Sequence, residues 1–291
     1  MQDDNYVYKS LSQDALDREY NNLNKVVNSE KILEKWVKLG NEACALLSCK
    51  LDIKYGRHER QSLDVFPTHI PGAPILAFFH GGYWSSRDKS ISRFLAPFYV
   101  ATGVNFVSVG YRLCPEVSIR DIIRDAESGL KWLNQNGASF DGDPQKLFVA
   151  GHSSGGHLTA FMCGSEGPDY LKGGCSISGI HDLDPIRVSF LNSRLGINAT
   201  DVKKLSPVFL AEKLTESSSK LPPIIVAVGS KEGKEYLRQS EELAASLAIA
   251  KQPCLSLQIE NGNHFSACEA FSDPASLISN EMLRLIFAPR F

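Results

Sequence analysis

Short apolar runs that alternate with helical stretches are the feature that most constrains the fold of this chain. Eight runs of strand length, bounded by turn residues, occupy 51–55, 61–66, 75–79, 105–109, 147–151, 175–178, 224–228 and 255–260. Helical periodicity fills the gaps between the later runs, over 118–136, 154–163, 234–250 and 274–286. Such alternation is typical of a parallel sheet that is covered by helices on both faces. We therefore predict an α/β fold with one mainly parallel, eight-stranded sheet.

The chain divides into a helical segment, residues 1–50, and a sheet-forming domain, residues 51–291. Apolar side chains recur at spacings of three and four residues over 11–27 and 29–47, which predicts two amphipathic helices. We expect this N-terminal segment to form a partial cap over a pocket.

One range of the sheet-forming domain departs from the alternation. Residues 180–221 contain Asp-Pro, Ser-Pro and Pro-Pro steps and a run of serines at 217–219. We interpret this range as an excursion between the sixth and seventh strands. Insertions at the ends of strands usually shape the pocket of a sheet enzyme, so we expect the same here.

Charge and composition exclude several classes of protein. The 291 residues carry 31 Lys and Arg against 33 Asp and Glu, so the formal net charge is −2 and offers no basic surface for nucleic acid. The longest apolar runs fall far short of the roughly 20 residues that span a bilayer. The N-terminus lacks the pattern of a secretory signal, and the seven cysteines include no C-x-x-C pair. We expect a cytoplasmic protein that binds neither nucleic acid nor membranes, either as a monomer or as a homodimer.

A serine motif lies between a predicted strand and a predicted helix. Residues 151–155 read G-x-S-x-G and join the run 147–151 to the helical stretch 154–163. In this context the motif is typical of a nucleophile elbow, a strained turn that exposes the serine hydroxyl. The N-terminus of the following helix stabilises developing negative charge. Ser153 is therefore the predicted nucleophile.

A serine hydroxyl needs a base that is oriented by an acid, and in this architecture the acid and then the histidine follow the serine. His264 lies in a Gly/Asn loop after the last run and is the predicted base, while His181 is a second candidate. Two carboxylates follow the run 224–228. Glu232 lies nearer the strand end and is the predicted acid. Glu235 falls where the next helix begins, so a favourable helix-dipole charge explains it equally well.

A His-Gly-Gly turn follows the third predicted strand, where such folds supply a donor for the oxyanion. We predict that the backbone N–H groups of Gly81, Gly82 and Ser154 form the oxyanion hole. The next two residues, Tyr83 and Trp84, are the predicted substrate-binding residues, because their rings can stack on an aromatic group. Packing within the scaffold is the alternative for both rings.

Three segments together resemble the α/β-hydrolase superfamily: HGGYW at 80–84, YRLCPE at 111–116 and GHSSGGHL at 151–158. Within it the chain resembles the hormone-sensitive-lipase-like esterases and, more closely, the kynurenine formamidases (arylformamidases), because Tyr83-Trp84 stands where the esterases usually have a third glycine. The resemblance extends from about residue 15 to the C-terminus and implies the α/β-hydrolase fold. It also implies Ser153 as nucleophile and His264 as general base and acid. The formamidases generally have an aspartate where this chain has Glu232.

The resemblance implies a small-molecule substrate, an aryl formamide such as N-formylkynurenine, which is an intermediate of tryptophan catabolism. Cleavage to the aryl amine and formate would pass through an acyl-enzyme without a cofactor. A carboxylesterase for short-chain or aryl esters is the alternative, since it uses the same triad. A non-catalytic binding protein of this fold is a second alternative, which the unusual Glu232 motivates. No metal is expected, because the histidines and cysteines lack ligand spacing.

Overall fold

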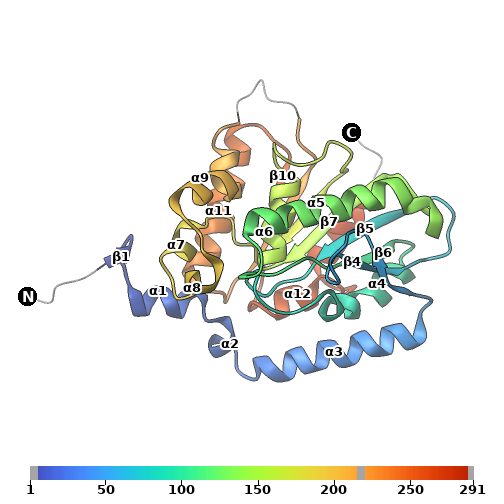
Figure 1. The fold of residues 1–291 in the computed structure, drawn as a ribbon, viewed down its shortest axis with the longest axis horizontal. Helices are drawn as coiled ribbons and strands as arrows, with labels where there is room; N and C mark the ends of the chain where they lie inside the picture. Colours follow the sequence, from blue (N-terminus) through green and yellow to red (C-terminus); the bar gives the residue numbers. More distant parts are fainter. Residues whose placement is uncertain (1–5, 215–219, 288–291) are drawn as a thin grey trace, which may run out of the picture.

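The structure is a computed structural model that describes residues 6–214 and 220–287. Figure 1 shows the main sheet with helices packed around it. The strand order of this sheet is β10-β9-β8-β7-β5-β6-β4-β3. The strands are β3 (Lys50–Lys54), β4 (Ser62–Phe66), β5 (Ala73–Phe79), β6 (Asn105–Val109), β7 (Gly142–His152), β8 (Gly174–Ile177), β9 (Ile224–Gly229) and β10 (Cys254–Ile259). The strands from β10 to β6 run parallel, whereas β4 and β3 are antiparallel to their neighbours. Each strand overlaps one predicted run, so the mainly parallel, eight-stranded sheet is confirmed.

Side chains of the central strands alternate between two cores, one on each face of the sheet. On β5, Ile75, Ala77 and Phe79 belong to one cluster, and Leu76 and Phe78 belong to the other. The first cluster includes side chains of α5 (Ile119–Asn136), α6 (Ser154–Met162) and α11 (Lys234–Ile249). The second includes side chains of α3 (Ser29–Leu46), α4 (Ala96–Ala101), α12 (Ser266–Ala270) and α13 (Leu277–Phe287). Helices therefore cover both faces, as predicted.

The N-terminal segment differs from the prediction in its first half. A hairpin of β1 (Tyr6–Tyr8) and β2 (Leu11–Ser12) comes first, and the first predicted helix is divided into α1 (Gln13–Tyr20) and α2 (Asn22–Lys25). The Asn21 side chain accepts a hydrogen bond from the Asn24 N–H and thereby caps α2. Asparagine favours such caps over helix interiors, which explains the break. The second predicted helix is α3, whose buried residues are spaced to share one face.

The excursion after β8 contributes helices rather than strands. Within its described residues it contains α7 (Asp184–Arg187), α8 (Asn192–Leu195), α9 (Ala199–Leu205) and α10 (Pro207–Ala211). Helices α7 and α8 lie beside α1 (Figure 1), and the Phe190 N–H donates a hydrogen bond to Asp17 of α1. The serines at 217–219 lie outside the described residues. The excursion and the N-terminal segment thus meet at one end of the sheet.

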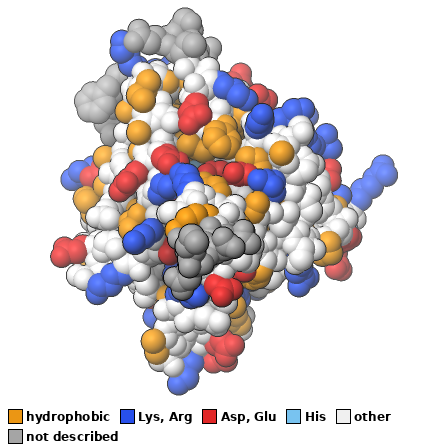
Figure 2. All heavy atoms as spheres, turned by 90° about the vertical axis from the view of Figure 1, so that its left-hand side faces the viewer, with side chains coloured by type: hydrophobic (Ala, Val, Ile, Leu, Met, Phe, Trp, Pro, Cys, Tyr) orange, Lys and Arg blue, Asp and Glu red, His pale blue; other side chains and the backbone are white. Residues whose placement is uncertain are grey.

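The surface at the left-hand side of the view in Figure 1 carries both positive and negative side chains. Figure 2 shows basic and acidic side chains interspersed with small hydrophobic patches. This distribution agrees with the nearly balanced composition of the chain. Within residues 6–214 and 220–287, no helix has the length and hydropathy that a transmembrane span requires.

Candidate active site

The turn between β7 and α6 holds Ser153 in a strained conformation. Its φ of 59° and ψ of −118° lie outside the regions that L-residues normally occupy. The Ser153 N–H donates to the carbonyl of Ile177 on β8 at 2.9 Å, which ties the turn to the sheet. Helix α6 begins at the next residue, so its unpaired N–H groups lie beside the serine. The turn has the backbone geometry that a nucleophile elbow requires.

Ser153 lies where the strand order reverses, because β5 has β6 on one side and β7 on the other. Open α/β sheets bind ligands at such points, outside the carboxyl ends of the strands. The loop after β5 approaches the serine closely: a Cβ atom on Gly81 would lie 3.1 Å from the Ser153 Cβ. Gly82 has a φ of +121°, which L side chains rarely adopt. Within the described residues, the N–H groups of Gly81 and Gly82 donate to no backbone acceptor, so they are free to bind an oxyanion.

Glu232 and His264 are joined by a short hydrogen bond. His264 Nδ1 lies 2.7 Å from Glu232 Oε2. Because a carboxylate accepts at this distance, Nδ1 carries the proton and Nε2 is left as a base. The other oxygen, Oε1, accepts from the Gly229 N–H at 2.8 Å and from the Ser178 hydroxyl at 2.5 Å. The Glu232 side chain is only 1% exposed, so these contacts fix its position.

The contact with Gly229 explains how the loop accommodates a glutamate. The Glu232 N–H donates to the Gly229 carbonyl at 3.1 Å, which forms a tight turn at the end of β9. The carboxylate folds back to the N–H of the same glycine. Glutamate has one methylene more than aspartate, and this folded-back conformation of the side chain accommodates it. The Glu232 carboxylate therefore still reaches His264.

The two alternative residues lie in other networks. Glu235 forms an ion pair with Arg238 at 2.7 Å and accepts a hydrogen bond from the Tyr20 hydroxyl at 3.0 Å. His181 is fully buried, and its Nε2 lies 2.9 Å from Ser176 Oγ. Neither residue lines the pocket that contains Ser153. The structure favours Glu232 and His264 over these alternatives.

Ser153 and His264 line one pocket of about 280 Å³. The loop after β5 contributes Gly81, Gly82 and Tyr83. The N-terminal segment and the excursion complete the walls with Tyr20, Asn21, Asn22, Leu23, Leu33 and Trp36, and with Phe190, Leu191 and Arg194, respectively. A concave site with aromatic walls and a few polar groups suits a small molecule with an aromatic ring.

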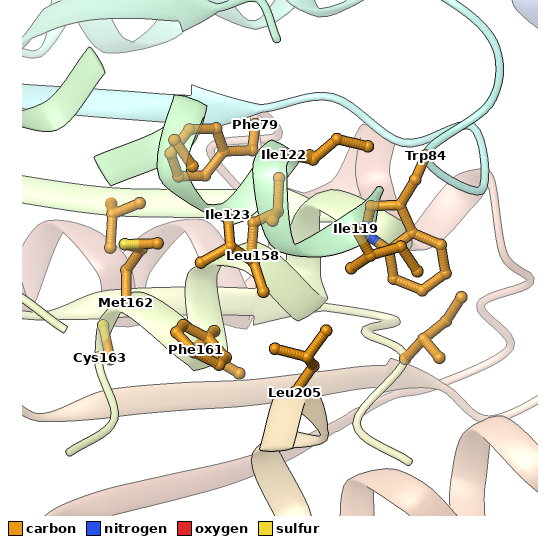
Figure 3. Packing of buried hydrophobic residues seen from close by; sticks show 14 of the residues in the cluster. Phe79, Trp84, Ile119, Ile122, Ile123, Leu158, Phe161, Met162, Cys163 and Leu205 are labelled. Atoms are coloured by element: carbon orange, nitrogen blue, oxygen red, sulfur yellow. The ribbon is translucent and has the colours of Figure 1, made fainter. Parts of the chain in front are cut away.

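Trp84 does not line this pocket, so its predicted contact with substrate is wrong. Its side chain is fully buried and packs edge-on against the His157 ring, with 5.0 Å between centroids. Figure 3 shows Trp84 beside Ile119 in the core cluster that also contains Leu158. Packing within the scaffold, the alternative considered above, accounts for Trp84. Tyr83, in contrast, does line the pocket.

A cluster of polar side chains beside Ser153 escaped the sequence analysis in part. The Tyr83 and Tyr236 hydroxyls lie 2.8 Å apart, and the Asn22 amide donates to both at 3.0 and 2.8 Å. The Tyr236 ring packs against His264, which lines the same pocket as Ser153, with 4.8 Å between ring centroids. Burial raises the pKa of both tyrosines well above the usual 10, so they remain neutral. Asn22 and Tyr236 are far apart in sequence, and no local motif marks their meeting.

His152 supports His264 from the other side and also went unassigned. Its Nε2 donates to the His264 carbonyl at 2.7 Å, and the two rings lie 4.6 Å apart. Burial, together with the neighbouring His264, holds the pKa of His152 well below its usual range. His152 is therefore neutral, and its one proton is on the nitrogen that anchors the His264 loop.

Three deeply buried histidines lead to a prediction about stability. Burial lowers the pKa of His80 and His157 from 6.5 to about 4, and that of His181 to about 3. The unfolded chain therefore binds these protons at higher pH than the folded chain does. Their stabilising contribution is complete above a pH of about 6.5 and is lost as the pH falls to about 4 for His80 and His157 and to about 3 for His181. We expect urea titrations to show a free energy of unfolding that falls over this window, by up to about 1.4 kcal/mol per pH unit for each histidine.

His157→Gln is the matched variant for this prediction. It removes the titrating group but keeps a donor for the Leu205 carbonyl, which His157 Nε2 contacts at 2.8 Å. Its stability should fall less steeply with pH than that of the wild type. Equal slopes in the two proteins would show that His157 is not the source of the effect.

Comparison with known proteins agrees with this geometry. The family described as "alpha/beta hydrolase fold" matches residues 76–267. This span contains the predicted nucleophile, acid and base and the predicted oxyanion-hole residues. The chain is 29% identical to the kynurenine formamidase of Danio rerio, over 96% of this chain and 98% of that protein. A solved structure from Silicibacter sp. tm1040 matches with a TM-score of 0.80 and 25% identity, covering 94% of this chain and 99% of the other. Esterase B from Lactobacillus rhamnosis matches with a TM-score of 0.71 and 18% identity, over 90% and 96% of the two chains. The chain therefore belongs to the alpha/beta hydrolase family and is an enzyme.

Proposed function

We propose that this protein is a serine hydrolase that cleaves an aryl formamide, N-formylkynurenine or a close analogue, to the aryl amine and formate. The observation that carries the proposal is the hydrogen bond from His264 to Glu232, at the pocket that His264 shares with Ser153. The Danio rerio relative that matches nearly the whole chain is named for this activity, which supports the choice of substrate.

In the proposed mechanism, the Ser153 hydroxyl attacks the formyl carbon while His264 Nε2 accepts its proton. The N–H groups of Gly81, Gly82 and Ser154 stabilise the resulting oxyanion. His264 then donates the proton to the leaving nitrogen, and the aryl amine departs from a formyl-serine. Water attacks this ester with His264 again as base, and formate leaves. Throughout, Glu232 orients the imidazole and stabilises its protonated form.

The dimensions of the site favour a small acyl group next to a large leaving group. The Gly81 backbone approaches Ser153 so closely that a Cβ atom on this residue would lie 3.1 Å from the Ser153 Cβ. A formyl group is the smallest acyl group, because it carries only a hydrogen on its carbonyl carbon. The aryl part of the substrate would occupy the space between the aromatic walls, which include Tyr83 and Phe190.

We also propose that the N-terminal segment acts as a partial cap. Tyr20 and Asn22 line the pocket. The Tyr8 hydroxyl donates to Asp182 at 2.9 Å, and the Tyr20 hydroxyl donates to Glu235 on α11 at 3.0 Å. These contacts hold the segment across the site, where it would limit access of water during the reaction.

A carboxylesterase is the second candidate, since an ester carbonyl is open to attack by the same serine and has a better leaving group. The two functions are separated by steady-state assays of N-formylkynurenine, by formate release, and of p-nitrophenyl acetate. We expect a higher kcat/KM for the formamide. Ester hydrolysis with formamide turnover at the no-enzyme background would exclude the formamidase and favour the esterase.

A further inference from the structure

An arginine without an acidic partner lines the active-site pocket. Arg87 follows the Gly81-Gly82 loop and lies in the same pocket as Ser153 and His264. The Arg60 guanidinium donates a hydrogen bond to the Arg87 carbonyl, which fixes the main chain at this point. The main chain from which the Arg87 side chain extends is thus fixed in place by a hydrogen bond.

Lys89 and Arg93, two cations that follow Arg87 closely in the chain, are paired with carboxylates, whereas Arg87 is not paired within the described part of the chain. Lys89 forms ion pairs with Asp52 and Asp64 at 2.7 and 3.3 Å, and Arg93 pairs with Asp64 at 2.8 Å. Asp88, the next residue, turns its carboxylate to the Ser90 N–H at 3.0 Å. Among the described residues, no carboxylate lies within ion-pair distance of the Arg87 guanidinium.

The pocket around Arg87 is positive, although the chain as a whole carries a net charge of −2. The described residues that line it include Arg87 and Arg194 and no aspartate or glutamate. Arg87 also borders a surface groove along α3 that carries Glu30, Glu34 and Glu42. Glu42 pairs with Lys38 at 4.0 Å, and within the described residues no ion pair joins any of the three to Arg87. Arg87 is half-buried, and burial lowers its pKa. A partly desolvated guanidinium without a counter-ion is unfavourable unless a ligand supplies the missing charge.

The positive charge of Arg87 affects the pKa of His152, which lies at the edge of the sheet that carries Ser153. After burial and the neighbouring His264, Arg87 is a further cause of the lowered pKa of His152. His152 itself lies next to Ser153 and anchors the His264 loop. Arg87 and Ser153 line the same pocket, so a substrate that is bound at Ser153 can present a substituent to this cation.

We propose that Arg87 binds a carboxylate on the leaving-group side of the substrate, so that the enzyme selects acyl donors whose aryl portion carries an anionic group. This inference rests on the proposed function and specifies its substrate class. A guanidinium matches a carboxylate in a two-bond, charge-assisted geometry that a neutral substrate cannot provide. Arg87 acts here as a specificity residue, and the bond-breaking steps remain with the serine and the histidine.

The test compares N-formylkynurenine, which carries a carboxylate, with formanilide, which carries no charge. We expect Arg87→Met to raise KM for N-formylkynurenine by about 10- to 100-fold, with a much smaller change in kcat. The ratio of kcat/KM for the charged to the neutral substrate should fall by a similar factor, and Arg87→Lys should recover part of it. Arg284→Met removes an exposed cation on α13 and controls for the overall charge.

Equal losses for both substrates in Arg87→Met would overturn the proposal, as would a loss of selectivity in Arg194→Met instead. Inhibition of the wild type by benzoate and by benzamide gives an answer that does not depend on any variant. Benzoate should bind at least about 10-fold more tightly, and equal inhibition contradicts the carboxylate site. If the enzyme cleaves no formamide, the proposed function fails. The comparison is then made with 4-acetoxybenzoate and phenyl acetate, which differ in the same carboxylate.

Discussion

Replacing Ser153 by alanine is expected to lower kcat/KM for the formamide by about 10⁴-fold or more. The side chain supplies the only hydroxyl in the proposed mechanism, and its strained turn at the start of α6 serves to present that group. Alanine keeps the fold because it removes one oxygen and adds no volume. Formate release measures the loss, and unfolding by urea checks that stability is retained.

Ser154→Ala is the matched control for this prediction. It removes the neighbouring hydroxyl and leaves the backbone N–H that we assign to the oxyanion hole. Its activity should stay within about 10-fold of the wild type, well above that of Ser153→Ala. Comparable loss in both variants, or turnover that survives Ser153→Ala, would show that the nucleophile lies elsewhere.

Glu232→Gln is expected to lower kcat by about three to four orders of magnitude. A neutral amide cannot stabilise the protonated imidazole, and its NH₂ group can pair with His264 Nδ1 in the wrong tautomer. Glu235→Gln provides the contrast, because Glu235 pairs with Arg238 and not with the histidine. That variant should lose stability and keep most of its kcat.

Glu232→Asp refines the same prediction. The shorter side chain cannot reach His264 Nδ1 and also accept from the Gly229 N–H without a shift of the loop. We expect an activity between those of the wild type and Glu232→Gln. Steady-state assays of formate release rank the variants. A larger loss of kcat in Glu235→Gln than in Glu232→Gln would overturn the assignment of Glu232 as the acid that orients His264.

The sheet was predictable because its strands are buried on both faces. Strand β6 coincides with the predicted run 105–109, and β5 is apolar throughout because its side chains enter two different cores. The capping box at Ser118 likewise marks the start of α5. Such signals are local, so a single sequence contains them. Helices α7 to α10 are too short and too irregular to produce a clear period.

The positions of Ser153, Glu232 and His264 were also predictable, because each follows a strand whose end lies at the same edge of the sheet. Trp84 was not, since its burial depends on how the loop after β5 packs against His157 on α6. Asn22, Tyr236 and Arg87 went unassigned for the same kind of reason. Their roles depend on tertiary contacts between segments that the sequence pattern does not connect.

The central claim is that Ser153 carries the formyl group between the amine and water. It is tested most directly by turnover of formanilide and of phenyl formate in the presence of hydroxylamine, with Ser153→Ala giving the background. Both substrates deliver the same formyl group, so a common formyl-enzyme predicts the same ratio of formohydroxamate to formate from each. Ratios that differ between the two substrates, or formate without any hydroxamate above background, would contradict the acyl-enzyme mechanism.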